Sequence, residues 1–332
     1  IGESAFMSAK ALEAADLSSA EFIGQKAFSE ATALKKVTFA EGVVIAATAF
    51  YGASQLDTVN FDKVSMIGDF AFAGTAVESA DLSNTIYIGD FAFMGTKLKS
   101  VKFGSGLMYL GENPFARCEI SAFTDKDGNT TFKVSDSLEI DGVVTDGVFV
   151  EDGVLYKQDL NGLQLVSYPM NKEEVDYKVK DGTYRISAMA FLDNKNIVSV
   201  ELPYALKAIG DKALFGCENL TVVIFKSVSA PILEEAYDES YSENLNNLPM
   251  TGYYGGQEGN EAYKGMGLIP FYMWTADPTV FFYGSNFINY VGKQTKPLVF
   301  VTPSNGLYYD TFVISQYYSS NVKGGAAPYE AT

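Results

Sequence analysis

A six-residue motif recurs at nearly constant spacing through the first third of the chain and returns in its second half. The motif is Ile-Gly-x-x-Ala-Phe, and consecutive early copies begin 22 residues apart, with one step of 21. This period is too short for a pair of helices, and it is typical of one strand plus a tight return in each turn of a solenoid. The copies begin at Ile1, Ile23, Ile45, Ile67, Ile88 and Leu110, and two more begin at Ile186 and Ile209.

An extended apolar pattern, such as Leu-x-x-Val-x-Phe at residues 34–39, follows the motif copies. Val37 and Phe39 are two residues apart and share one face of a strand, while Lys36 and Thr38 point to the other face. The predicted fold is therefore mainly β with short helices or turns, a solenoid whose strands are parallel and pair in sequence order. We expect these strands near residues 12–17, 34–39, 56–61, 77–82, 98–103, 197–202 and 220–225.

The Ala-Phe step of the motif supplies core residues to the return path of each turn. Phe28, Phe50, Phe72 and Phe93 are expected to stack as a buried column. The motif glycines at 24, 68 and 89 suit a place where a side chain would clash or where φ is positive. One turn cannot bury its apolar face alone, so stability must come from the stacking of neighbouring turns.

The two motifs, recurring in phase, resemble the BspA-like leucine-rich repeats of bacterial cell-surface proteins. The resemblance covers residues 1–116 and 186–225, and Asp-Gly-Val-Leu-Tyr at 152–156 is similar to the longer variant repeats of that family. It implies the α/β leucine-rich-repeat class and a right-handed solenoid with a C-terminal cap. It also implies export to the surface of a host-associated bacterium, or secretion, and adhesion to host or bacterial macromolecules.

The repeat divides the chain into two expected regions. Residues 1–225 form the solenoid, in which 117–185 break the period with longer repeats and hairpins, because Asp-Gly and Asn-Gly turn signals separate the strand-like runs. Residues 226–332 form a non-repeat cap with an aromatic-rich insertion at 234–294. Within the cap, a strand is expected at 297–303 and a terminal helix at 307–318.

Composition excludes several function classes. The chain has no histidine, which removes Ser-His-Asp and Cys-His catalysis and the commonest metal ligand. Its net charge of −17 disfavours nucleic acid, and no apolar run is long enough to span a membrane. We therefore predict a monomeric, non-enzymatic protein without a cofactor or metal. Because the chain begins inside a motif copy at Ile1, we expect a trimmed precursor whose signal or membrane anchor lies outside this sequence.

Three smaller features have unremarkable interpretations. Cys118 and Cys217 occupy slots before a strand and are expected to be buried free thiols, at least two turns apart. Asp125, Asp127 and Asn129 have spacing suggestive of calcium, but the glycine is misplaced for an EF-hand, and a hairpin tip explains them. The acidic run that begins at Glu234 is interpreted as a solvated loop.

Two surfaces are candidates for binding an extracellular protein or glycan. The first is a row of outward side chains on the strand ladder, which a plain solvated sheet face would also explain: Asp16, Thr38, Asn60, Asp81, Lys102 and Glu201. The second is a group of C-terminal aromatic residues, which could instead fill the core of the cap: Tyr253, Tyr254, Tyr272 and Trp274.

The predicted function is a binding or adhesion module at the cell surface. Two alternatives stay open. One is a surface glycan-binding or glycan-degrading protein, in which case glycan binding would disappear on Trp274→Ala. The other is a structural spacer, which would bind nothing and yet keep its length in solution scattering.

Overall fold

The structure is a computed structural model. It describes residues 1–137, 139–140, 143–144, 146–227, 231–234, 298–304, 308–314 and 330–331. The chain divides into two compact units, the first comprising residues 1–161 and 166–172 and the second comprising residues 162–165 and 173–332. Each unit is described by itself.

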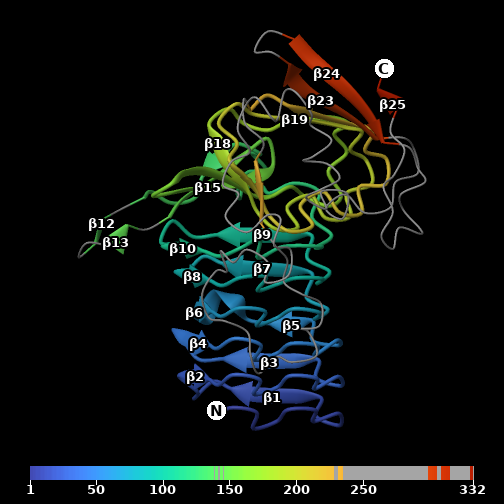
Figure 1. Ribbon diagram of the computed structural model, residues 1–332. Coiled ribbons are helices and arrows are strands. Elements are labelled where there is room, and N and C mark those ends of the chain that lie inside the picture. The colour runs from blue at the N-terminus through green and yellow to red at the C-terminus, as the bar shows by residue number, and fades with distance from the viewer. Residues whose placement is uncertain are drawn as a thin grey trace, which may run out of the picture. The chain divides into compact units, whose positions relative to one another are not determined.

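Parallel strands on one side of the first unit confirm the predicted ladder (Figure 1). Each begins about two residues later than expected, because the first apolar residue of the pattern lies in the turn; Leu34, for example, donates its N–H to the Ala31 carbonyl. One expected pairing is absent, that between the strands at 56–61 and 77–82, because the first of them ends early and a 3₁₀ turn at Phe61–Lys63 follows it. The ladder is therefore divided into two sheets. The strands are β1 (Ala14–Leu17), β3 (Lys36–Phe39) and β5 (Thr58–Val59) in one sheet, and β7 (Ser79–Leu82) and β9 (Ser100–Phe103) in the other.

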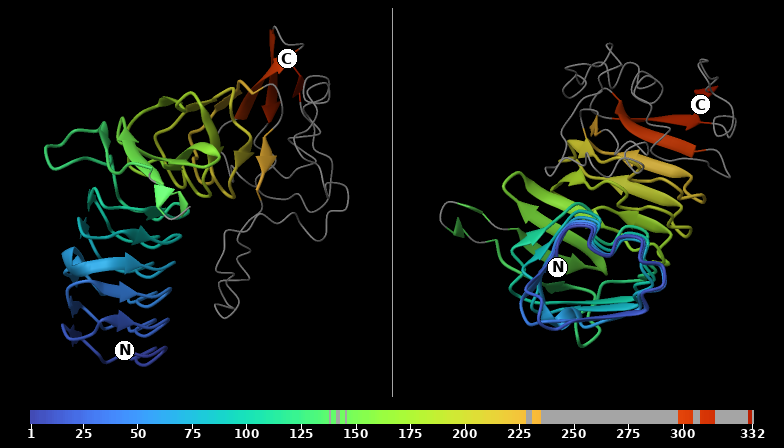
Figure 2. Two further views of the ribbon diagram at one scale, coloured as in Figure 1. Left: turned by 90° about the vertical axis from the view of Figure 1, so that its left-hand side faces the viewer. Right: turned by 90° about the horizontal axis from the view of Figure 1, so that it is seen from below.

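A second parallel sheet, which the strand prediction did not include, runs along the same turns. Its strands end on the first residue of the six-residue motif, so Ile23, Ile45 and Ile67 point inward and are buried. The strands are short: β2 (Phe22–Ile23), β4 (Val43–Ile45), β6 (Val64–Ile67), β8 (Tyr87–Ile88) and β10 (Tyr109–Leu110). Seen along the stack, the early turns lie over one another (Figure 2).

The predicted phenylalanine column is confirmed. Phe28, Phe50 and Phe72 are at most 1% exposed, and their rings stack in sequence with centroids 5.1 and 5.2 Å apart. Phe93 continues the column at 5.6 Å from Phe72, with Phe6 and Phe115 at its two ends. Backbone hydrogen bonds hold the return paths together, such as the one from Phe28 N–H to the Ala49 carbonyl (2.7 Å).

The motif glycines are needed for close approach between turns. A Cβ at Gly68 would lie 2.5 Å from the backbone nitrogen of Ala47, and one at Gly24 would lie 2.7 Å from that of Glu3. Neither glycine has positive φ. These glycines are therefore needed because a side chain would clash with the neighbouring turn, and not because their φ is positive.

The irregular segment of the first unit contains antiparallel hairpins, as the turn signals predicted. β12 (Glu139–Ile140) pairs with β13 (Val143–Val144), and β14 (Gly147–Glu151) pairs with β15 (Val154–Asp159). The second hairpin turns at Asp152 and Gly153, which both have positive φ, as type I′ turns require. β11 (Phe132–Lys133) pairs with the outer edge of β14.

The second unit repeats the two-sheet plan. One sheet contains β17 (Asp176–Lys178), β19 (Ser199–Leu202), β21 (Val222–Phe225), β23 (Leu298–Ser304), β24 (Tyr308–Ile314) and β25 (Glu330–Ala331). The other contains β18 (Thr183–Ile186), β20 (Ala208–Ile209) and β22 (Ile232–Leu233), and residues 163–165 of β16 (Gly162–Ser167) pair with β18 in parallel.

The end of the chain requires one correction. The strand expected at 297–303 is present as β23, which pairs in parallel with β21. The helix expected at 307–318 is wrong, because β24 occupies residues 308–314 of this segment and pairs with β23 in antiparallel register. Its composition explains the outcome, since tyrosine, threonine, phenylalanine, valine and isoleucine all favour strands. The boundary at 225/226 stays a prediction.

The three smaller features have defined environments. Cys118 and Cys217 are buried free thiols, and burial raises the pKa of each to about 12. Asp125 accepts hydrogen bonds from the backbone and the side chain of Asn129, as at a turn tip. Glu234 forms an ion pair with Arg185 (2.5 Å), so it is not a solvated residue, while the rest of its acidic run lies outside the described residues.

Candidate functional site

The outward row predicted from the sequence is held in register by the first ladder. Asp16 lies opposite Thr38 on β1 and β3, and Asp81 lies opposite Lys102 on β7 and β9. We call Asp16, Thr38, Asn60, Asp81 and Lys102 the polar row. Glu201 occupies the corresponding place in the second unit, on β19, where it pairs with Lys226.

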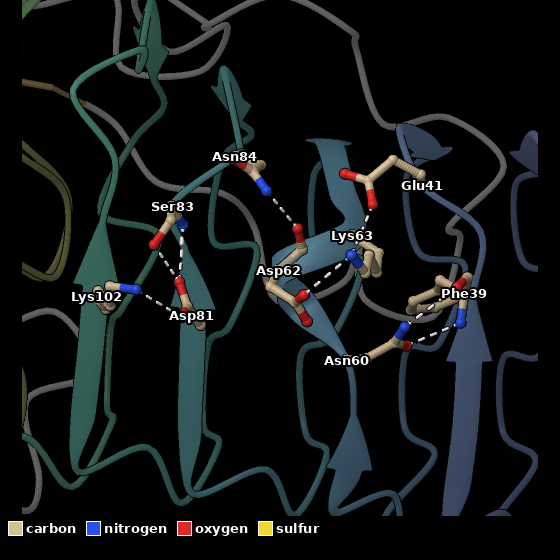
Figure 3. Close-up of polar contacts among 9 residues, drawn as sticks. All are labelled: Phe39, Glu41, Asn60, Asp62, Lys63, Asp81, Ser83, Asn84 and Lys102. Carbon is tan, nitrogen blue, oxygen red and sulfur yellow. Dashed lines mark hydrogen bonds and ion pairs between the residues drawn. The ribbon is translucent and has the colours of Figure 1, made fainter.

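Asn60 has a structural role in the row. Its side-chain oxygen accepts the backbone N–H of Phe39 (2.8 Å), and its side-chain nitrogen donates to the Phe39 carbonyl (3.1 Å). The amide thus replaces the next strand residue at the point where β5 ends (Figure 3). An asparagine engaged in this way fixes the backbone and offers little to a ligand.

Ion pairs between successive turns occupy much of the remaining polar surface. Lys102 contacts Asp81 (2.9 Å), and Lys63 contacts Glu41 (2.7 Å) (Figure 3). Asp81 also accepts a hydrogen bond from the Ser83 hydroxyl, and together with Lys102 this holds the pKa of Asp81 below its usual range despite partial burial. Exposed pairs of this kind contribute at most about 1 kcal/mol each, so they fix side-chain positions more than they stabilise the fold.

The second sheet displays an outward row of apolar side chains that the sequence analysis did not single out. Phe22 lies opposite Val44, Val44 opposite Met66, and Tyr87 continues the register to Tyr109. We call Phe22, Val44, Met66, Tyr87 and Tyr109 the apolar row. Phe22 is 51% exposed and Tyr109 is 38% exposed, so this side of the turns is open to solvent. The signal was present, since each residue directly precedes a copy of the motif.

The repeats match a known family. The model of the BspA type leucine rich repeat region matches residues 1–122 and 171–253, with six copies. The chain belongs to this family. The BspA-type repeats thus include the early turns as well as the turns of the second unit, as the sequence resemblance predicted.

Solved structures with similarity to the BspA-type chain come from bacteria. A leucine rich cell surface protein of Faecalibacterium prausnitzii is 26% identical, with a TM-score of 0.48; the match covers 69% of this chain and 64% of that one. A leucine-rich repeat protein of Eubacterium ventriosum is 19% identical, with a TM-score of 0.49 and coverage of 65% and 60%. The chain therefore spans less than two thirds of the length of either protein. A search of the curated proteins gave no match.

The group of C-terminal aromatic residues was the second candidate surface predicted from the sequence. Tyr253, Tyr254, Tyr272 and Trp274 lie outside the described residues. In the part of the chain that the structure does describe, no cluster of three potential metal ligands occurs. No helix in that part is long and apolar enough to cross a membrane.

A ladder of carboxylates borders the apolar row in the BspA-type turns. Asp69 accepts the backbone N–H of Asp90 (2.8 Å), and Asp90 accepts the backbone N–H of Glu112 (2.7 Å). We call Asp69, Asp90 and Glu112 the acidic ladder. Burial raises the pKa of Asp90 to about 6, and the charges of Asp69 and Glu112 add to this shift while Lys157 opposes it. Burial also raises the pKa of Asp69.

The raised pKa of Asp90 predicts a pH-dependent effect of Asp90→Asn. The folded state binds the Asp90 proton more tightly than the unfolded state, so this group destabilises the fold as pH rises from about 4 to 6. Asparagine retains an oxygen for the Glu112 N–H and carries no charge. At pH 7.5 the variant should have a free energy of unfolding up to about 3 kcal/mol higher than wild type, and near pH 4 the difference should vanish.

Urea unfolding of both proteins at the two pH values measures this difference. Glu21→Gln, which removes an exposed carboxylate beside Phe22, serves as the control and should change little at either pH. A stabilisation by Asp90→Asn that is equal at both pH values would contradict the titration argument.

Proposed function

We propose that the chain is a non-catalytic binding or adhesion module, displayed at the cell surface or secreted, that recognises an extracellular protein or glycan. Membership of the BspA-type family supports this location and role. The absence of histidine and the burial of both cysteines support a non-catalytic protein, because the commonest general base is lacking and both thiols are inaccessible.

The observation that carries the proposal is the register of the outward rows. Each turn adds one side chain at the same place on the surface, and neighbouring strands lie about 4.8 Å apart. Rows of this kind present an extended, evenly spaced surface, which solenoids use to bind extended partners. The rigid backbone beneath them reduces the entropy lost on binding.

Within the polar row, the ligand contact is assigned to the side chains that are not committed to the backbone. Thr38 and Lys102 meet this condition, because Asn60 is held by Phe39. Asp16 is engaged by Ser18, whose hydrogen bonds hold the pKa of Asp16 below its usual value. A partner would therefore meet a polar, charge-paired surface that favours hydrogen bonds.

A capture experiment tests the proposal. The intact chain is immobilised and exposed separately to host matrix proteins, serum and bacterial glycans, and the bound fraction is identified. The double variant Thr38→Arg/Lys102→Glu should weaken retention of the captured ligand by about tenfold, as loss of a central contact does. The matched control is Lys97→Glu, which reverses the charge of an exposed lysine in the same repeat as Lys102 but outside the row. This variant should retain the ligand.

Two outcomes contradict the proposal at different levels. Equal retention by the double variant and by wild type would exclude the polar row as the contact. Capture of nothing from any of the three sources would instead support a spacer role.

A further inference from the structure

The apolar row has no role in the core, and its composition calls for an explanation. The inward neighbours on the same strands, such as Ile23 and Ile88, already fill the interior and are fully buried. The outward positions of a two-residue strand face solvent, so polar side chains would be sufficient there. These positions instead hold the exposed aromatic residues Phe22 and Tyr109. Ile86, which is 39% exposed, and Met108, which is 38% exposed, add apolar surface beside them. Contiguous exposed apolar surface of this kind marks interaction sites.

We propose that the apolar row and the acidic ladder together form the docking site for an amphipathic helix that carries lysine or arginine along one flank. This inference deepens the proposed function by naming the partner class of a second surface on the same turns. The apolar side of the helix would lie on the row, and its cationic flank would face the carboxylates.

The direction of the row favours a helix. Four strand spacings of about 4.8 Å give a row about 19 Å long, which a helix of about 13 residues spans. An occupant parallel to the strands would meet only one or two apolar side chains, because β2, β8 and β10 are two residues long. Along the row, helical anchors recur about every 5.4 Å, closer to the strand spacing than the 6.6 to 6.8 Å of an extended chain.

Addition of a strand to the sheet edge is blocked at β10. The Asp146 carboxylate accepts the N–H of Leu110 (3.1 Å), and the Lys157 ammonium donates to its carbonyl (2.7 Å). These side chains occupy the backbone groups that an added strand would need. At the β10 end, a partner must therefore use the face of the sheet.

The two tyrosine rings in the row disfavour a sugar as their occupant. Tyr87 and Tyr109 stack on each other, with centroids 4.5 Å apart and planes 10° from parallel. The Lys157 ammonium lies 5.7 Å from the Tyr109 centroid. Each tyrosine thus has one ring face covered by the other, and Lys157 lies over Tyr109, so the ring edges and the aliphatic groups of Val44 and Met66 are the surface that these turns offer a partner.

The carboxylates beside the row determine which charge the partner should carry. Asp69 and Asp90 each lie two residues after the buried isoleucine that ends β6 or β8, and Asp69 accepts the backbone N–H of Asp90. Burial raises the pKa of the neighbouring Tyr87, and the charges of both carboxylates add to the shift. The acidic ladder therefore flanks the row on one side, while Ile86 and Met108 give an apolar flank. The net charge of −17 adds long-range attraction for a cation. An anionic helix would meet repulsion from both sources.

Binding of a designed probe to the full chain tests the inference. The probe is a fluorescein-labelled peptide of roughly 18 residues with leucines at helical spacing and lysines on the flank. A second peptide replaces lysine with glutamate, and a third arranges the same leucines and lysines in strict alternation. Fluorescence anisotropy should show saturable binding of the first peptide, weakened by salt, and at least tenfold weaker binding of the other two.

Variants locate the site. Val44→Gln/Met66→Gln should weaken probe binding by about tenfold or more, and Asp69→Asn/Glu112→Gln should weaken it several-fold and flatten its salt dependence. Ser79→Gln/Ser100→Gln, at exposed positions of β7 and β9, is the matched control and should stay within about twofold of wild type. Unfolding midpoints confirm that each variant is folded.

The inference is overturned if the glutamate or the alternating peptide binds as tightly as the first, if the control pair weakens binding equally, or if no peptide binds saturably. Because the assay uses no natural ligand, its failure leaves the capture result of the polar row intact.

Discussion

Phe72→Ala is expected to lower the free energy of unfolding by about 3–5 kcal/mol, the range for truncation of a large core side chain. Phe72 is fully buried and stacks on Phe50 and Phe93, while Phe61 meets its ring edge-on at 4.9 Å. Removing the ring leaves a cavity in the middle of the column. Because each turn is stabilised by its neighbours, the loss should weaken the coupling of the turns on both sides.

Chemical denaturation followed by circular dichroism measures the effect. Phe22→Ala removes the same atoms from a residue that is 51% exposed, and it should cost far less. A broadened transition in Phe72→Ala would show that the turns before and after it unfold separately. Equal unfolding midpoints for Phe72→Ala and wild type would mean that the inward face is wrongly assigned.

The sequence predicted the column because its signal is periodic and redundant. Phe28, Phe50, Phe72 and Phe93 recur at the same place in every copy, so an error in one copy could not displace the assignment. The inward and outward alternation of β1, β3, β7 and β9 followed from the two-residue period of a strand. The outward register of Asp16 with Thr38 and of Asp81 with Lys102 was obtained in the same way.

The second sheet was missed because its strands are too short to show alternation. Three of its five strands contain only two residues, so a single outward residue precedes each inward isoleucine or leucine. That residue varies from phenylalanine to valine, methionine and tyrosine. The feature shared by these positions is apolar character, which becomes a pattern only when the copies are aligned and read down a column.

Local backbone geometry also could not be predicted from the sequence. The fourth motif residue has positive φ in several turns, at Lys26, Thr48 and Phe91. None of these residue types favours that region, and threonine, which is β-branched, disfavours it. Bonds to the next turn impose the conformation, such as that from Thr48 N–H to the Asp69 carbonyl (2.8 Å). Asn60 was likewise assigned to the binding row from its register alone, which cannot reveal its bonds to Phe39.

The second large effect is expected where the hairpin segment closes the edge of the second sheet. Lys157 and Asp146 are each only about a tenth exposed, and their charged groups lie 3.6 Å apart. Burial raises the pKa of Asp146, although Lys157 lowers it. Lys157→Met keeps the length of the side chain but leaves the carboxylate without its cation and the Leu110 carbonyl without its donor. Breaking such a pair should cost about 3–5 kcal/mol at pH 7.

The double variant Asp146→Asn/Lys157→Met separates the charge from the packing. It removes the uncompensated carboxylate and retains an oxygen for the Leu110 N–H, so it should recover much of the loss. Acid should do the same for Lys157→Met, because Asp146, whose pKa is already raised, becomes neutral as pH falls through it. Urea unfolding at pH 7 and pH 4, each compared with wild type at the same pH, measures both effects. A loss that is as large at pH 4 as at pH 7, and that the double variant does not relieve, would show that Lys157 acts through its packing and its hydrogen bond, without a contribution from its charge.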